Sequence, residues 1–244
     1  MRIDTVSLDI FIKTLCLSSA TIVLIYYFSI TNLRAMIAKM TILNYQIIVD
    51  RLLRDIRQFI PNFANMPVGA LALDLCCGTG AQVCEFGRTG ITATGIDIDS
   101  NILKTATKNK VKNNLENVSF QQADATNLPF RDCYFDCVSI SFGLHDKGRI
   151  TREKIVSEMN RVVKANGTLI FVDFQVPLPA NISGLVARVI EFLVDGDHYR
   201  NFKDFLRSGG IESLIKTNTP HEVTRVLLKN RMAMALRIDC QRYL

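Results

Sequence analysis

The feature that most constrains the fold is the segment 70–80, in which an apolar run containing Asp74 leads directly into a turn with Gly78 and Gly80. A compact apolar run bounded by glycines is typical of a buried strand that continues into a helix. The same alternation recurs along the chain, with strands expected at residues 70–75, 92–96, 118–121, 137–141 and 168–174, and helices at residues 100–113 and 151–163. This order predicts an α/β fold with a doubly wound, mostly parallel sheet and helices on both faces.

Further helices and a hairpin are expected on either side of this core. Apolar residues recur at helical spacing over residues 42–60, and we expect Pro61 to end that helix and residues 62–67 to form a connector. The hairpin would add an antiparallel strand to the sheet. The C-terminal elements expected are helices at residues 182–193 and 199–206 and a strand pair at residues 221–228 and 231–238, joined by a tight turn at Lys229 and Asn230.

Two carboxylates are predicted to lie at the ends of neighbouring strands. Asp74 precedes the glycine turn, and Asp97 follows Gly80 by seventeen residues at the end of the next expected strand. In an open parallel sheet, ligands bind beyond the carboxyl ends of the strands. Glycines in the turn let the backbone approach a ligand closely. An acid at the position of Asp97 can accept hydrogen bonds from both hydroxyls of a ribose.

A dinucleotide-binding site uses similar geometry but fits these residues poorly. Its G-x-G-x-x-G fingerprint requires a third glycine, and Val83 occupies that position here. The carboxylate of Asp74 would repel a pyrophosphate, whereas it would attract an ammonium group. A nucleotide-dependent oxidoreductase is therefore the less favoured alternative.

The segment 73–80 resembles the first motif of class I S-adenosylmethionine-dependent methyltransferases, with Cys76 where many members have glycine. Residues 95–99 are similar to the second motif, and residues 123–125 resemble the stretch whose acid binds the adenine amine. The likeness covers about residues 70–177 and implies seven strands in the order 3-2-1-4-5-7-6, with the last one antiparallel. It also implies that S-adenosyl-L-methionine is held by Asp74, Cys76, Gly78, Thr79, Gly80, Asp97, Ile98, Asp124, Ala125, Ser141 and Phe142.

Within that superfamily, residues 141–144 and 173–177 look most like the ubiquinone/menaquinone biosynthesis C-methyltransferases of the methyltransferase type 11 group. Those enzymes usually continue with Arg-Asn, where this chain has His145 and Asp146. The likeness implies a small, apolar or membrane-borne acceptor that is quinone-like or lipid-like. A soluble metabolite methylated on N, O or S, and a cofactor-binding protein without transferase activity, remain alternatives.

Histidine is the natural candidate for a base that deprotonates the acceptor. The chain has three histidines. We expect catalytic or acceptor-contacting roles for His145, just past the strand at residues 137–141, and for His198 with Tyr199, at the start of a late helix. Loop stabilisation by His145, and helix capping and packing by His198 and Tyr199, are the alternatives, while His221 is expected to be remote.

The first forty residues form a separate apolar segment, ahead of a methyltransferase domain at residues 41–244. Residues 14–33 carry no charge, and this length approaches what a bilayer requires. The segment could anchor the chain to a membrane or lie on it, cover the mouth of the active site, or be an upstream extension of a start at Met36 or Met40. Basic residues after it would keep the main domain on the cytoplasmic side.

Composition and net charge limit the classes of partner that the chain is expected to bind. A net charge of +6 favours anionic ligands or surfaces, but no basic run resembles a nucleic-acid arm. The chain also lacks the Asn/Asp-Pro-Pro-Tyr/Phe tetrapeptide of base methyltransferases after residue 141, so we expect no nucleic-acid partner. The seven cysteines lack the paired spacing of a zinc site. They are expected to be reduced, as in a cytoplasmic protein, and no metal is expected.

Overall fold

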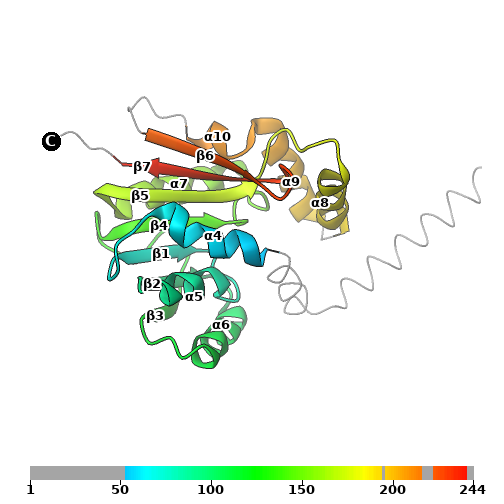
Figure 1. Cartoon of the computed structure of the whole chain (residues 1–244). Coiled ribbons are helices and arrows are strands. Elements are labelled where there is room, and N and C mark those ends of the chain that lie inside the picture. The colour runs from blue at the N-terminus through cyan, green and yellow to red at the C-terminus, as the bar shows by residue number, and fades with distance from the viewer. Residues whose placement is uncertain (1–52, 194–195, 216–221, 241–244) are drawn as a thin grey trace, which may run out of the picture. The chain divides into compact units, whose positions relative to one another are not determined.

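The computed structural model describes residues 53–193, 196–215 and 222–240 (Figure 1). The apolar segment predicted at residues 14–33 lies outside them, so its three interpretations and the division at residue 40 stay predictions. Within the described ranges, no helix combines the length and the apolar character needed to cross a membrane.

The sheet has the predicted seven strands in the order β3-β2-β1-β4-β5-β7-β6. All neighbours from β3 to β5 run parallel, whereas β7 pairs antiparallel with both β5 and β6. The doubly wound fold and its antiparallel hairpin are therefore confirmed. The strands are β1 Leu71–Leu75, β2 Thr92–Asp97, β3 Val118–Gln122, β4 Phe135–Ser141, β5 Val163–Phe174, β6 Glu222–Leu228 and β7 Ala233–Asp239.

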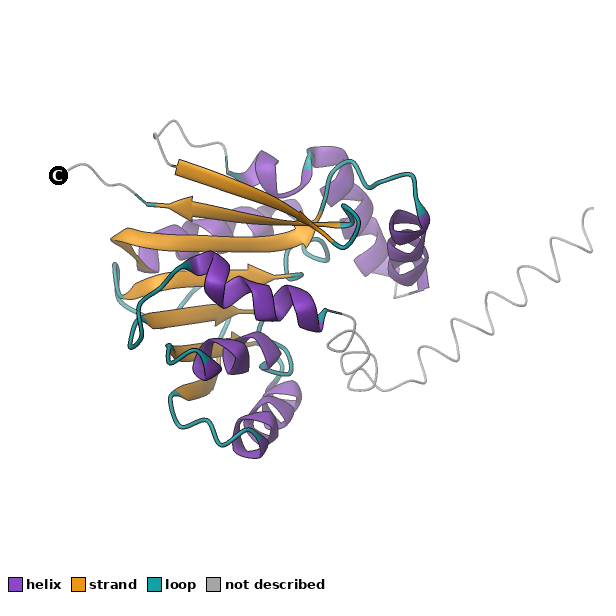
Figure 2. Ribbon diagram, viewed as in Figure 1, coloured by secondary structure: helices purple, strands orange, loops and turns teal. Residues whose placement is uncertain are grey.

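Helices cover both faces of the sheet (Figure 2). Side chains of a strand point alternately to opposite faces. Along β5, Leu169 and Phe171 accordingly join the hydrophobic cluster with α7, α9 and α10, while Ile170 and Val172 join the cluster with α4, α5 and α6. The helices are α4 Arg54–Ala64, α5 Ala81–Arg88, α6 Ser100–Lys112, α7 Arg149–Val162, α8 Ile182–Leu193, α9 Gly196–Ser208 and α10 Gly210–Leu214.

The strand register brings the carboxyl ends of the central strands to one edge of the sheet. Asp74 on β1 lies opposite Gly95 on β2 and opposite Ser139 on β4. Asp97 ends β2 two residues beyond Gly95. The two acids predicted to face one ligand are therefore on neighbouring strands at the same edge, as the sequence indicated.

The expectation that Pro61 ends the first helix was wrong, because α4 continues through Pro61 to Ala64. Proline removes a backbone donor and so leaves the carbonyl four residues earlier without its helical partner. Here that carbonyl belongs to Arg57, and it accepts a hydrogen bond from Gln82 Nε2 at 3.3 Å. The helix ends instead at Asn65, whose φ of 53° is left-handed. The part of the predicted helix before residue 53 lies outside the described ranges.

Three further features differ from the prediction. Strand β5 begins at Val163, directly after α7, because Val163 pairs with Phe135 on β4. The hairpin turn takes four residues, 229–232, and is closed by a hydrogen bond from Met232 N to the carbonyl of Lys229. The short helix α10 was not predicted. The early start of β5 arises from pairing with a strand that is distant in the sequence.

Close packing of β2 against the glycine turn predicts that Gly95 tolerates no side chain. A Cβ at Gly95 would lie 2.7 Å from Val83 Cγ2, 2.9 Å from Cys77 Sγ and 2.9 Å from Phe120 Cδ1. We expect Gly95→Ala to lower the free energy of unfolding by about 1–3 kcal/mol, measured by urea denaturation. The control is Gly148→Ala, where a Cβ meets nothing within 4 Å and the expected loss is below about 1 kcal/mol. Equal losses in the two variants would contradict this packing.

Candidate active site

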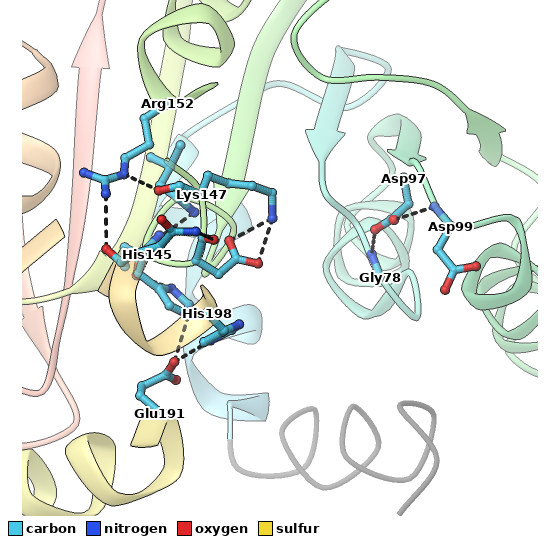
Figure 3. Close-up of polar contacts among 12 residues, drawn as sticks. Gly78, Asp97, Asp99, His145, Lys147, Arg152, Glu191 and His198 are labelled. Atoms are coloured by element: carbon cyan, nitrogen blue, oxygen red, sulfur yellow. Dashed lines mark hydrogen bonds and ion pairs between the residues drawn. The ribbon is translucent and has the colours of Figure 1, made fainter. Parts of the chain in front are cut away.

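The carboxylate of Asp97 shapes the glycine turn. Its Oδ2 accepts a hydrogen bond from Gly78 N at 2.9 Å, and its Oδ1 accepts one from Asp99 N at 3.0 Å (Figure 3). Cys77 N donates to the carbonyl of Ile96 at 2.9 Å. These bonds tie the loop after β1 to the end of β2, so the turn is held open towards the edge of the sheet.

Three residues of the turn have left-handed backbone conformations. The φ angles are 52° at Cys76, 52° at Gly78 and 72° at Gly80. Only glycine adopts this region without strain, and a residue with a Cβ pays roughly 1–2 kcal/mol. Cys76 thus takes the conformation that favours the glycine found in many members of the resembled family. A Cβ at Gly80 would lie 2.4 Å from the ring of Phe120, so that glycine is required for packing.

Asp74 is almost completely buried at the end of β1. It accepts a short hydrogen bond from Ser139 Oγ at 2.6 Å. Burial raises the pKa of Asp74 to about 7 and the charge of Asp97 adds to the rise, while the bond from Ser139 and the charge of Arg57 oppose it. A cation bound beside Asp74 would favour its ionised form.

A cavity of about 740 Å³ opens at this edge of the sheet. Its walls come from the glycine turn, the loop after β4, helices α4, α5, α8 and α9, and the β6–β7 turn. The lining residues are Leu53, Arg57, Asp74, Cys76, Cys77, Gly78, Thr79, Gln82, Ser141, Phe142, His145, Asp146, Phe174, Ile182, Ser183, Val186, Ala187, Ile190, Glu191, His198, Lys229, Asn230 and Met232.

One end of the cavity is polar and buried. His145 Nδ1 lies 2.8 Å from Asp173 Oδ1, and His145 Nε2 lies 3.6 Å from Glu191 Oε2. The same Glu191 oxygen lies 2.5 Å from His198 Nε2. Burial favours the neutral ring of His145, but the charge and hydrogen bond of Asp173 outweigh it and the charges of Glu191 and Asp146 add to their effect, so the pKa of His145 rises to about 9.

The wall formed by α8 is apolar. Ile182, Val186, Ala187 and Ile190 of this helix line the cavity, and Phe142, Phe174 and Met232 line it from other elements. The helix also shows apolar side chains to solvent, because Ile182 is 80% exposed and Leu185 59% exposed. An apolar wall beside a buried polar end suits a small molecule with a mostly apolar body and a few polar atoms.

The cavity brings together many of the residues predicted from the sequence. Those in its lining are Asp74, Cys76, Gly78, Thr79, Ser141, Phe142, His145 and His198.

The other predicted residues fall outside the lining. Ile98 is 68% exposed. Asp124 is exposed and accepts hydrogen bonds from Thr126 N and Thr126 Oγ1, both at 2.8 Å, and these bonds lower its pKa. The ring of Tyr199 packs edge-on against Phe192. Gly80, Asp97 and Ala125 also lie outside the lining, although Asp97 holds the glycine turn that forms it.

Sequence reasoning missed several residues of this site. Arg57, Gln82 and Glu191 line the cavity, and Asp173 orients His145. The sequence does contain a signal for two of these residues, Asp173 and Glu191. Asp173 is a carboxylate near the end of an apolar strand, and Glu191 is the one acid within the apolar helix at residues 182–193.

Comparison with known proteins agrees with this geometry. A family model described as "Methyltransferase domain" matches residues 73–171, which include the glycine turn, Asp97 and the loop after β4. This part of the chain is similar to methyltransferase domains.

Relatives of the domain include named enzymes. The ubiquinone/menaquinone biosynthesis C-methyltransferase UbiE of Klebsiella pneumoniae is 32% identical over 166 residues, which cover 62% of this chain and 64% of that enzyme. UbiE of Yersinia pestis is 37% identical over 126 residues, which cover 50% of this chain and 49% of that enzyme. The chain therefore matches less than two thirds of the length of these relatives.

Solved structures share the fold. The PH0226 protein from Pyrococcus horikoshii matches with a TM-score of 0.61 at 18% identity, over 83% of this chain and 94% of its own. A SAM-dependent methyltransferase from Aquifex aeolicus matches with a TM-score of 0.54 at 16% identity, over 75% and 89% respectively. Because these sequence identities are only 18% and 16%, the two matches show a shared fold and no more.

The burial of Asp74 predicts a pH-dependent stability. An acid whose pKa rises on folding, here from 3.8 to about 7, contributes stability that is present at low pH and is lost as the pH rises towards the folded-state value. Asp74→Asn removes this loss, so urea denaturation at pH 8 should show the variant more stable than the wild type by up to about 4 kcal/mol. The advantage should shrink as the pH falls towards 4.

The matched control for that experiment is Asp124→Asn, because hydrogen bonds from Thr126 lower the pKa of Asp124. An acid with a lowered pKa stabilises the fold at high pH, so this variant should be slightly less stable than the wild type at pH 8. A difference between Asp74→Asn and the wild type that is independent of pH would contradict the burial of an ionisable group at this position.

Proposed function

We propose that this chain transfers a methyl group from S-adenosyl-L-methionine to a small, apolar acceptor that is quinone-like or lipid-like. The observation that carries the proposal is the buried carboxylate of Asp74 in the cavity wall, beside a glycine turn held by Asp97. The matching methyltransferase domain and the named C-methyltransferases among its relatives support it.

The residues around the turn fit this cofactor. Among the described residues, Ser141 Oγ and Gln82 Oε1 are buried atoms without a hydrogen-bond partner, and both residues line the cavity. Buried polar atoms are rarely left unpaired, so these two favour a polar ligand in the cavity. When bound, the cofactor supplies an electrophilic methyl group on a sulfonium.

Each acid has a proposed partner on the cofactor. Asp74 would bind the ammonium of the methionine part, because a buried carboxylate gains most from a cation. Asp97 would accept hydrogen bonds from the ribose hydroxyls. Both of its oxygens already accept one backbone N–H, but a carboxylate oxygen can accept a second bond. Asp124, in the loop after β3, would bind the adenine amine.

The remaining task of the chain is to align and desolvate the acceptor. The apolar residues of α8 would hold its body, and the polar end with His145, Glu191 and His198 would bind its oxygen or nitrogen atoms. His145, His198 and Tyr199 stay the candidate catalytic residues. Tyr199 does not line the cavity, so its proposed role would be exerted through its packing against Phe192 and Phe202.

An apolar acceptor is supported by the surface beside the cavity. Exposed apolar residues of α8 lie next to residues of the same helix that line the cavity, so a membrane-borne acceptor could enter along this helix. We propose that this surface, with residues 14–33, contacts the cytoplasmic side of a membrane. His145 and Asp146 stand where the quinone enzymes usually have Arg-Asn, so the acceptor class includes lipids as well as quinones.

Cofactor binding can be measured directly. Purified chain should bind S-adenosylhomocysteine in isothermal titration calorimetry, and Asp97→Ala should weaken binding at least ~10-fold because the ribose contact and the anchor of Gly78 are both lost. Asp132→Ala is the control, since Asp132 is exposed, pairs with Arg161 and does not line the cavity. Tight NADH binding without S-adenosylhomocysteine binding would instead indicate an oxidoreductase.

Transfer is tested with cofactor labelled in its methyl group. Label should enter a lipid or quinone extract, and His145→Gln should lower the rate at least ~10-fold while S-adenosylhomocysteine affinity stays unchanged, because His145 lies at the acceptor end of the cavity. Full transfer by His145→Gln would contradict the role of this residue. Cofactor binding with no transfer into any extract would favour a binding protein without transferase activity.

A further inference from the structure

The polar end of the cavity contains three groups that can bind a metal. One ligand atom each from His145, Glu191 and His198 lies within 4.8 Å of the others. The three come from separate elements, namely the loop after β4, helix α8 and helix α9. Figure 3 shows the two rings and the carboxylate gathered together, on a different side of the view from Gly78 and Asp97.

We propose that His145, Glu191 and His198 bind a divalent transition-metal ion, with Zn²⁺ as the best match. Two imidazoles and one carboxylate form a ligand set that zinc takes in open, catalytic sites, where a fourth position is left for water or substrate. Hard cations such as Mg²⁺ prefer oxygen ligands, so the two imidazoles favour zinc over magnesium.

The ring of His145 is held as a ligand by its other nitrogen. His145 Nδ1 is bonded to Asp173 Oδ1 at 2.8 Å, and Asp173 is itself fixed by backbone N–H groups of Leu144, His145 and Phe174. Such a carboxylate sets the tautomer and orientation of a metal-binding histidine. Nε2 is thereby left facing Glu191, where a metal ion can bind.

The distances suit a shared ion after one small movement. Ligand atoms about 2.0–2.1 Å from a tetrahedral zinc lie roughly 3.3 Å apart. The distance of 3.6 Å from His145 Nε2 to Glu191 Oε2 is close to that value. His198 Nε2 and Glu191 Oε2, at 2.5 Å, are hydrogen-bonded and would have to separate. His198 has room for this, since its side chain is 22% exposed, whereas the side chain of Glu191 is 4% exposed.

Charge balance favours a dication at this position. The carboxylates of Asp173 and Glu191 are both buried and share two imidazole neighbours. The centroids of the two rings are 5.4 Å apart. A dication bound to these groups would compensate the buried carboxylate charge.

The open position of the ion would face the cavity, since all three ligands line it. An oxygen, nitrogen or sulfur atom of the acceptor could occupy that position. This last step rests on the proposed function, whereas binding of the ion itself does not.

The test uses the full chain, stripped with a chelator and titrated with Zn²⁺ alone in a calorimeter. We expect one ion per chain, and at least ~10-fold weaker binding in Glu191→Gln and in His198→Gln, since each loses a ligand, and in Asp173→Asn, which loses the group that orients His145. Glu212→Gln is the matched control, because Glu212 is an exposed acid paired with Arg225, and its affinity should equal that of the wild type.

Substitution with Co²⁺ identifies the ligands by their absorption. Visible bands of a tetrahedral nitrogen and oxygen site, lost in Glu191→Gln and His198→Gln, would support the proposal. Absence of Zn²⁺ binding, equal affinity in all variants, or a thiolate charge-transfer band from cysteine ligands would overturn it. Titration of S-adenosylhomocysteine into the same metal-free protein tests the proposed function without the ion. A failure of the metal site can thereby be distinguished from a failure of the proposed function.

Discussion

The hydrogen bonds of Asp97 to Gly78 and Asp99 are the interaction on which the site depends. They join the loop after β1 to the end of β2 and so convert two adjacent strand ends into one rigid edge. The turn can then take left-handed angles at Cys76, Gly78 and Gly80 without collapsing onto the sheet. The cavity begins where this turn ends, and every further wall is added by elements that pack around it.

The cavity combines two different environments. Its α8 wall is apolar, whereas its far end holds buried carboxylates and imidazoles in direct contact. Burial makes each of those charges expensive unless another charge compensates it. The same physical requirement explains the raised pKa of Asp74, which is buried beside the hydroxyl of Ser139, and the close pairing of His145 with Asp173.

Much of the fold could be predicted from the sequence. The alternating strands and helices, the glycine turn and the acids at the strand ends were visible as local patterns, and the strand order followed from the family resemblance. Predictions from local patterns failed where a residue distant in the sequence compensates a hydrogen bond that is missing locally. Pro61 does not end α4, because Gln82 satisfies the carbonyl that the proline leaves unpaired. The sequence predicted no metal site because the cysteines lack paired spacing, and the cluster of two histidines and a glutamate that could hold an ion comes together only in the fold.

The sequence alone determined which residues stand at the ends of the central strands, since strand periodicity and glycine turns are set by neighbouring residues. It thereby placed Asp74, Asp97 and His145 at one edge of the sheet. Only the tertiary structure decided that Glu191 and His198 meet His145. The periodicity of α8 and α9 predicts the two helices, but it does not show which distant elements they pack against. A carboxylate within an apolar helix has no assigned partner until the chain has folded, and here folding pairs it with two histidines.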